Sequence, residues 1–461
     1  MPEMKLTKLE FAAALKRGQG RALQYVRQHG LSEVGDLVLE SCLKNPAYDR
    51  QCEGSRATWL FRMFQDSEDY DRFSAAVLSA LSSLPSEADS YDLEHLCELA
   101  ALMAKAGDEV AANALRSRVL AQPLNWPHSL YGCQPLVALD GVPAVVALAR
   151  RFGQLLIEEP DERPPNVDYL TEDLGIFDEA ALELQRFAET DWDIKRYLDN
   201  EEVYAARERE FQQKSPDERR REGWERVRKE LTLDGILNDA ALGVGEYPGR
   251  YMRFGKYATD GELKIVLQRL VEETQETVCL RLLWIFRRTP LPELHPKIWQ
   301  LADSKDDALR YSAVEALAQS QDPRVGELGR SRLRSGAFTS RDSDTLDLFI
   351  RNYQPQDERL ILSALASRSP DEDEAHSLGS SLLRICEGNS TCSSLDMLKW
   401  VYESTPCTVC RHSAVKQMAA IGCVAPEIVA ECLDDADEDL RHLAKELAVA
   451  TGQQLPLEAD H

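Results

Sequence analysis

Residues 306–333, DDALRYSAVEALAQSQDPRVGELGRSRL, constrain the fold more than any other stretch of this chain. Four apolar residues of its first half recur at the helical period and form one stripe: Leu309, Ala313, Ala316 and Leu317. Pro323 suits the first position of a second helix, because its missing N–H costs nothing there. Val325 and Leu328 then form the inner face of that helix. Two helices this short cannot bury their apolar faces alone, so the segment predicts helix pairs stacked on similar neighbours.

The same pattern recurs in the C-terminal half, where an arginine follows an apolar residue. The marker pairs are Leu280-Arg281, Leu309-Arg310, Cys410-Arg411 and Leu440-Arg441. The first two arginines are 29 residues apart and the last two are 30 residues apart, which is the length of one short helix pair. With alanine three residues after the arginine and a D-P-x-V turn, the pattern resembles the short HEAT-like repeats of the phycobilisome-lyase type over about residues 275–450. The first unit departs from it, because Trp284 stands where the alanine belongs.

This resemblance implies an all-α fold, an α-solenoid of stacked antiparallel helix pairs, and it brings no catalytic residue with it. Amphipathic segments separated by breakers extend the helical prediction to the N-terminal part. Six regions are expected: N-terminal helical repeats at 1–121, a connection and a helix at 122–157, an acidic insertion at 158–206, a charged helix with a Gly-rich basic-aromatic segment at 207–274, C-terminal HEAT-like repeats at 275–452 and a polar tail at 453–461. Alternation around Arg250–Tyr257 also allows one small β-hairpin.

Composition is typical of a cytoplasmic protein. No apolar run approaches the roughly 20 residues that a membrane-spanning helix needs. The first residues, MPEMKLTKLEF, lack the basic and apolar regions of a signal peptide. Eleven cysteines without a paired framework indicate a reducing compartment. We therefore expect a cytoplasmic chain that makes no contact with a membrane.

The formal net charge of −25 indicates which partners suit this chain. An acidic surface repels phosphates, so it disfavours general nucleic-acid binding and favours another protein with a basic or mixed-charge surface. The charge is uneven, because residues 207–341 hold 25 basic and 22 acidic residues, whereas residues 158–202 hold 4 basic and 16 acidic residues. This asymmetry predicts separate acidic and charge-balanced surfaces.

The charge-balanced region contains a candidate nucleic-acid interface. Basic and aromatic residues are interleaved in one short run: Arg250, Tyr251, Arg253, Phe254, Lys256 and Tyr257. Further arginines follow at Arg287, Arg288, Arg330, Arg332 and Arg334. Single-stranded nucleic acid is bound by such sets, with cations on the phosphates and rings stacked on the bases. Two alternatives stay open. Either the rings pack into a neighbouring helix while the cations face water, or the acidic residues 158–202 fold against the run and cover it.

A group of cysteines forms the second candidate site. The candidate zinc ligands are Cys386, Cys392, Cys407, Cys410 and His412. Cys407 and Cys410 have the C-x-x-C spacing of metal ligands and follow Pro406 at an expected helix start, where the helix dipole stabilises thiolates. The repeat alignment favours simple packing instead, since Cys410 takes the core position of Leu309 and Leu440. We therefore expect no metal and no cofactor.

The chain lacks the motifs of common catalytic sites, namely H-E-x-x-H, G-x-S-x-G and G-x-x-x-x-G-K-[ST]. The favoured function is a non-enzymatic scaffold or adaptor, because stacked helix pairs build extended faces that bind proteins. A nucleic-acid-associated subunit that uses residues 250–257 is one alternative. The repeat resemblance implies another, a lyase or isomerase that acts on a bound ligand.

Overall fold

The computed structural model describes residues 5–85, 89–121, 131–245, 247–336, 338–339, 342–389 and 394–451. Every regular element in these ranges is helical, which confirms the all-α prediction. None of the described helices combines the length and the apolar composition that crossing a membrane requires. The predicted polar tail, most of the connection after residue 121 and Cys392 lie outside the described residues.

The chain forms two compact units. Unit 1 comprises Met1–Gln212, Cys407–Val409 and Ala425–His461, and unit 2 comprises Gln213–Pro406 and Cys410–Val424. The helices of unit 1 in its N-terminal part are α1 (Lys8–Arg17), α2 (Gly20–His29), α3 (Gly35–Leu43), α4 (Arg50–Glu53), α5 (Ala57–Phe64), α6 (Tyr70–Ser83), α7 (Ser90–Lys105), α8 (Glu109–Arg116), the π-helical η1 (Ser117–Ala121), α9 (Cys133–Asp140), α10 (Val142–Glu158), α11 (Val167–Leu170), α12 (Phe177–Ala188) and α13 (Trp192–Gln213). Its C-terminal part adds α27 (Pro426–Cys432) and α28 (Glu438–Thr451).

Amphipathic stripes explain the helices of unit 1. In α6 the buried residues Phe73, Val77 and Leu81 recur every four positions, which places them on one face of the helix. The stripes of successive helices meet in one hydrophobic core that extends along the chain from Phe11 to Tyr197.

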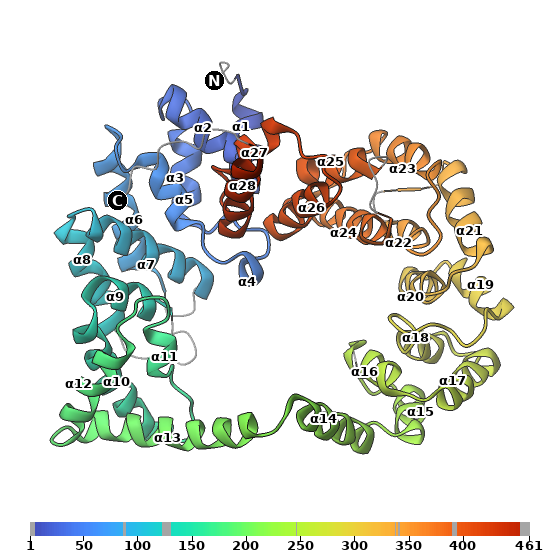
Figure 1. Cartoon of the computed structure of the whole chain (residues 1–461), viewed down its shortest axis with the longest axis horizontal. Helices are drawn as coiled ribbons and strands as arrows, with labels where there is room; N and C mark the ends of the chain where they lie inside the picture. The colour runs from blue at the N-terminus through green and yellow to red at the C-terminus, as the bar shows by residue number, and fades with distance from the viewer. Residues whose placement is uncertain are drawn as a thin grey trace. The chain divides into compact units, whose positions relative to one another are not determined.

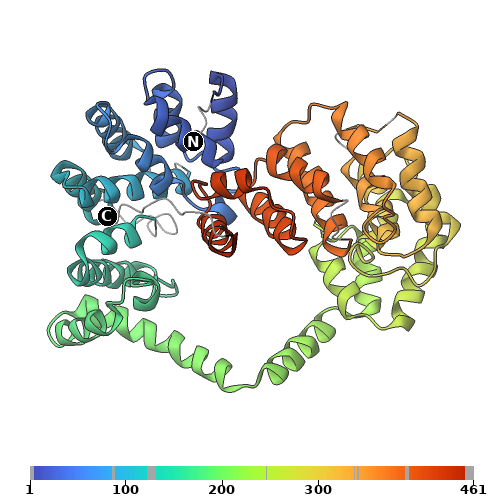
Figure 2. The same cartoon turned by 45° about the horizontal axis from the view of Figure 1, so that its top comes forward.

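The C-terminal helices α27 and α28 pack within unit 1 against its first helices. Gln24 on α2 donates a 3.0 Å hydrogen bond to the carbonyl oxygen of Ala430, and Arg21 forms a 2.7 Å ion pair with Glu431. Gly20 permits this approach, because a Cβ at that position would lie 1.9 Å from the carbonyl oxygen of Glu431. Figures 1 and 2 show α27 and α28, in red, beside α1 and α2, in blue. Periodicity groups residues 425–451 with the C-terminal repeats, whereas their packing partners are N-terminal helices.

Unit 2 is also built from helices alone in its described residues. These are α14 (Pro216–Glu230), α15 (Leu233–Leu242), α16 (Gly249–Tyr257), α17 (Asp260–Glu272), α18 (Glu276–Trp284), α19 (Pro296–Ala302), α20 (Asp307–Ala318), α21 (Pro323–Arg334), α22 (Ser343–Asp347), α23 (Asp357–Ala366), α24 (Glu372–Gly388), α25 (Leu395–Ser404) and α26 (Thr408–Ala420). Four of them, α18, α20, α22 and α24, pack each against the next (Figure 1).

Residues 306–333 form α20 and α21, which confirms the predicted helix pair. The predicted stripe of α20 is fully buried, and the backbone N–H of Leu309 donates to the carboxylate of the N-cap Asp306 at 2.8 Å. Pro323 is the first residue of α21, and Val325 lies in the core. Local sequence therefore accounts for both helices.

The segment for which a small hairpin was allowed is helical instead. In α16 the residues Tyr251, Phe254 and Gly255 are buried, and their spacing matches one face of a helix and not of a strand. Gly255 packs against the end of the neighbouring helical segment, since a Cβ there would lie 2.1 Å from the carbonyl oxygen of Ile285. Glycine at this position serves close helix packing and is not the mark of a turn.

Candidate functional site

The basic-aromatic run folds as α16, and this helix turns its first two rings inward. Tyr251 and Phe254 are 0% and 1% exposed, and the Tyr251 ring centroid lies 5.6 Å from that of Trp284. The Tyr251 hydroxyl donates a 2.7 Å hydrogen bond to the carbonyl oxygen of Val244, and burial raises its pKa. These two rings belong to the core of unit 2, so they offer no free face for stacking on a base.

The cations of α16 remain at the surface of unit 2. Arg253 and Lys256 are exposed. Arg250 forms a 2.7 Å ion pair with Asp239, and the Lys256 ammonium lies 5.5 Å from the centroid of the Tyr257 ring. Residues 250–257 therefore expose their cations, whereas the rings of Tyr251 and Phe254, which were predicted to stack on bases, are buried.

Most of the downstream arginines are engaged within unit 2. Arg330 is 8% exposed and donates from Nε and Nη2 to the two carboxylate oxygens of Asp357, at 2.8 and 2.9 Å. Three others form ion pairs: Arg287 with Glu315, Arg332 with Asp303 and Arg334 with Glu327. Arg288 is exposed. A phosphate group would have to compete with these carboxylates for the paired arginines.

Two buried aspartates on α22 form a polar cluster that sequence reasoning missed. Asp344 and Asp347 are 2% and 3% exposed. Asp347 lies 3.2 Å from a guanidinium nitrogen of Arg384, and burial raises its pKa. Burial also raises the pKa of Asp344 to about 6, although Arg332 and Arg310 act in the opposite direction. Acidic residues are so frequent in this sequence that nothing in the run SDTLD singles these two out.

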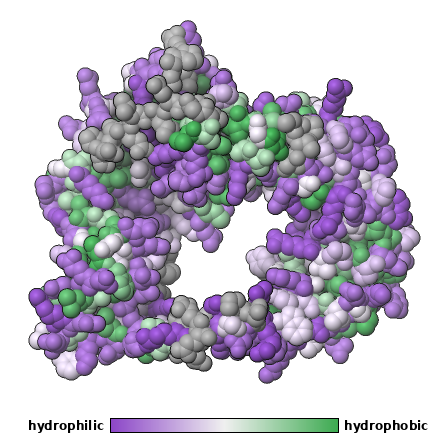
Figure 3. Space-filling view, viewed as in Figure 1, coloured by the Kyte–Doolittle hydropathy of each residue, from purple (hydrophilic) through white to green (hydrophobic). Residues whose placement is uncertain are grey.

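The acidic region of unit 1 carries exposed apolar side chains. They are Tyr169, Leu174, Phe177, Leu182, Trp192 and Val203, with Trp192 the most exposed at 74%. Trp192, Asp199 and Val203 are spaced by seven and four residues, so they follow one line along α13. The buried Ile194 and Tyr197 lie on the opposite face. We call Trp192, Asp199 and Val203 the α13 stripe. Hydrophilic residues dominate the faces of both units that are seen in Figure 3.

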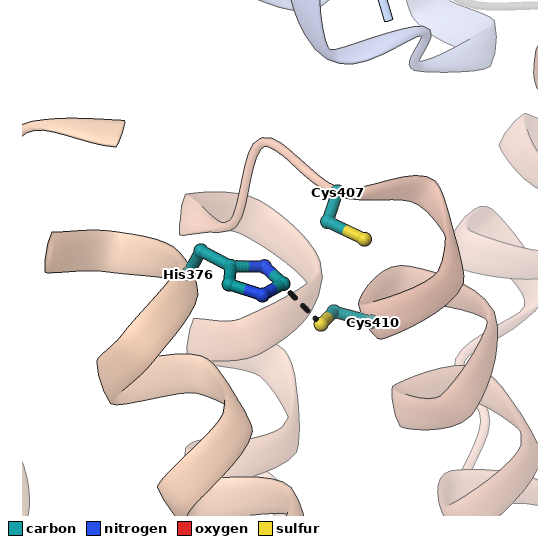
Figure 4. Close-up of side chains that lie close together, drawn as sticks. All are labelled: His376, Cys407 and Cys410. Atoms are coloured by element: carbon teal, nitrogen blue, oxygen red, sulfur yellow. Dashed lines mark hydrogen bonds between the residues drawn. The ribbon is translucent and has the colours of Figure 1, made fainter. Parts of the chain in front are cut away.

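The structure brings together two of the predicted cysteines and adds a histidine. Cys407 and Cys410 lie at the start of α26, where their thiols form a group with His376 of α24 (Figure 4). The ligand atoms of the three residues all lie within 4.8 Å of one another. Among the described residues, Cys386 and His412 stay outside this group. The Cys386 thiol is buried in α24, which raises its pKa to about 12.

The sequence did not predict His376 as a member of this group, because it lies 34 residues before Cys410. No local motif joins residues at that distance. The repeat length is the signal that would have found it, since residues about one repeat apart become neighbours when helix pairs stack.

Comparisons with known proteins place this chain in no family. No model of a protein family, no curated protein and no solved structure matches it.

Proposed function

We propose that this chain is a non-enzymatic scaffold that binds another protein through the α13 stripe of unit 1. The observation that carries the proposal is the 74% exposure of the Trp192 side chain. Tryptophan is enriched among the residues that dominate protein–protein binding energies, because a partner buries a large rigid ring at little entropic cost. Val203 adds a second exposed apolar side chain on the same face, three helical turns from Trp192.

Charge around the stripe selects a partner with a basic or mixed-charge surface. Residues 158–202 hold 16 acidic and 4 basic residues, and Asp199 lies within the stripe itself. The Lys195 ammonium already lies 5.0 Å from the centroid of the Trp192 ring, so the indole face attracts cations. Lysine and arginine side chains of a partner would gain from both the ring and the carboxylates. Opposite charge also accelerates association, most strongly at low ionic strength.

A HEAT-like α-solenoid is the architecture we propose for this scaffold. The succession of α18, α20, α22 and α24 supports it, since solenoids stack one helix of each pair against the next. The arginine markers agree, because Arg281 lies on α18 and Arg310 on α20, two helices of this succession. Extended faces of this kind suit protein binding better than chemistry on a small molecule.

Nucleic-acid binding has weaker support. The rings of Tyr251 and Phe254 are buried, and the guanidinium of Arg330 donates two hydrogen bonds to the carboxylate of Asp357. No contact among the described residues favours the lyase or isomerase alternative over scaffolding.

Affinity capture with matched tryptophan variants tests the proposal. The full chain, Trp192→Ala and Trp224→Ala would each be used as bait in extract of the native host at low salt. Trp224 is the control, because it is 45% exposed but lies in unit 2 on α14. We expect a basic protein to be retained by the wild type and by Trp224→Ala, with at least about tenfold less on Trp192→Ala. Equal retention on all three baits, or no retained protein, would exclude the stripe as the binding surface.

A further inference from the structure

We propose that His376, Cys407 and Cys410 bind one Zn²⁺ ion. The Sγ atom of Cys410 lies 3.7 Å from Nδ1 of His376, and the ligand atom of Cys407 lies within 4.8 Å of both partners. The ligand atoms of a tetrahedral zinc site with these donors are about 3.5–3.8 Å apart. Small side-chain rotations around a metal ion therefore suffice to close the group. Figure 4 shows the imidazole of His376 and the thiol of Cys410 facing each other, with the Cys407 side chain next to them.

Local structure explains why the two thiols meet. Cys407 directly precedes α26 and Cys410 lies in its first turn, so one helical turn separates them. The free backbone N–H groups of a helix start favour negative charge, which favours the thiolate forms that bind metals. His376 is supplied by α24, against which α26 packs through a 3.3 Å hydrogen bond from Gln417 to the carbonyl oxygen of Leu383.

The donor set favours zinc over other common ions. Two sulfur atoms and an imidazole nitrogen suit Zn²⁺, whereas Mg²⁺ and Ca²⁺ prefer oxygen ligands. Two thiolates neutralise the charge of the ion, which suits a site where Cys407 and Cys410 are 3% and 9% exposed. Binding releases the two thiol protons to solvent, so affinity should fall at acidic pH. Three protein ligands leave the fourth position of the tetrahedron for a water molecule.

A third ligand distinguishes this group from packed thiols or a disulfide pair. A disulfide needs only the two cysteines, and packing with the Cys410–His376 hydrogen bond does not need the Cys407 thiol, whereas zinc uses all three donors. His376 is half-buried, so the site has a polar edge through which an ion can enter. None of the three residues belongs to the α13 stripe, so the zinc site and the proposed scaffold function can fail independently.

Zinc titration of the full chain tests the site. The reduced protein would be stripped of metal with a chelator and titrated with Zn²⁺ against a coloured competitor, and Co²⁺ would report the geometry through its visible absorption. The ligand variants are Cys407→Ser, Cys410→Ser and His376→Gln. Cys386→Ala is the control, because it removes a buried thiol from α24 without touching the group. We expect one zinc ion per chain for the wild type and the control, and at least about tenfold weaker binding for each ligand variant.

Two further readouts keep the test decisive. Saturating zinc should raise the midpoint of thermal unfolding of the wild type and the control, but not that of the ligand variants. Far-UV circular dichroism would show that each variant is helical, and His376→Gln, at a half-buried position, is the variant on which the conclusion would rest. Equal zinc affinity in His376→Gln and the wild type would overturn the proposal. So would a wild-type chain that binds no zinc, or one in which Cys407 and Cys410 form a disulfide under reducing conditions.

Discussion

The indole Nε1 of Trp59 donates a 2.8 Å hydrogen bond to the carbonyl oxygen of Asp434, 375 residues later in the chain. Trp59 is a core residue of α5, and Asp434 follows α27. Two side chains of α2 reach the same aspartate, Gln24 at 3.1 Å and Arg27 at 2.5 Å. The segment after α27 is therefore bonded to two helices of the N-terminal part of unit 1. This relationship makes the C-terminal segment a structural part of that unit.

Replacing Trp59 with phenylalanine should weaken unit 1 measurably. Trp59→Phe keeps an aromatic ring in the core but leaves the carbonyl oxygen of Asp434 without its indole donor. We expect a loss of about 1–3 kcal/mol in the free energy of unfolding, measured by urea denaturation. Trp192→Phe is the control, since it makes the same change at a side chain that is 74% exposed, and it should cost less than about 0.5 kcal/mol. Equal losses would show that the buried hydrogen bond contributes nothing.

A methyl group at Gly255 should destabilise unit 2. The added Cβ of Gly255→Ala would lie 2.1 Å from the carbonyl oxygen of Ile285, which is backbone and cannot rotate away. We expect a cost of about 1–3 kcal/mol in chemical denaturation. Gly249→Ala tests the same substitution at the first residue of α16, where a Cβ would meet nothing within 4 Å. If Gly249→Ala is as unstable as Gly255→Ala, helix packing is not the reason for glycine at 255.

Removing one partner of the Arg330–Asp357 ion pair should strongly lower the free energy of unfolding. Arg330→Met leaves a buried carboxylate that is 2% exposed, and we expect a loss of about 3–5 kcal/mol. The double variant Arg330→Met/Asp357→Leu removes both charges and should recover part of that loss. Arg334→Met breaks the exposed pair with Glu327 and should cost about 1 kcal/mol or less. A double-mutant cycle in urea denaturation measures the coupling, and a coupling energy near zero would contradict the expectation.

Asp344 should make the stability of unit 2 depend on pH. Burial raises its pKa from an ordinary value of 3.8 to about 6, so the folded chain holds this proton more tightly than the unfolded chain does. The stability that this tighter proton binding contributes is fully present below the pKa that Asp344 has in the unfolded chain. It is lost as the pH rises through about 6. The free energy of unfolding of Asp344→Asn should therefore equal that of the wild type near pH 4 and exceed it by about 2–3 kcal/mol above pH 7.

Urea denaturation of both chains across this pH range measures the difference. Asp342→Asn, at a less buried carboxylate of the same segment, is the comparison variant. A constant difference between Asp344→Asn and the wild type at all pH values would show that Asp344 does not titrate as described.

Sequence periodicity predicted the helices well where burial follows a local stripe. The residues that line α20 and α6 are buried as their spacing indicates, and Pro323 begins α21. The interpretation of residues 250–257 was less complete, because basic-aromatic interleaving leaves open whether rings face a partner or the core. Only the packing of Tyr251 against Trp284 decides that question.

The sequence by itself determined the all-α class and the spacing of Cys407 and Cys410, because both depend on residues within one or two helical turns. The tertiary structure alone decided that His376 joins these cysteines, that Asp344 is buried and that Trp59 bonds to Asp434. Each of these relationships links residues on different helices, or depends on what other helices cover. Hydrophobic periodicity specifies which face of a helix is buried, but it does not specify which other helix covers that face.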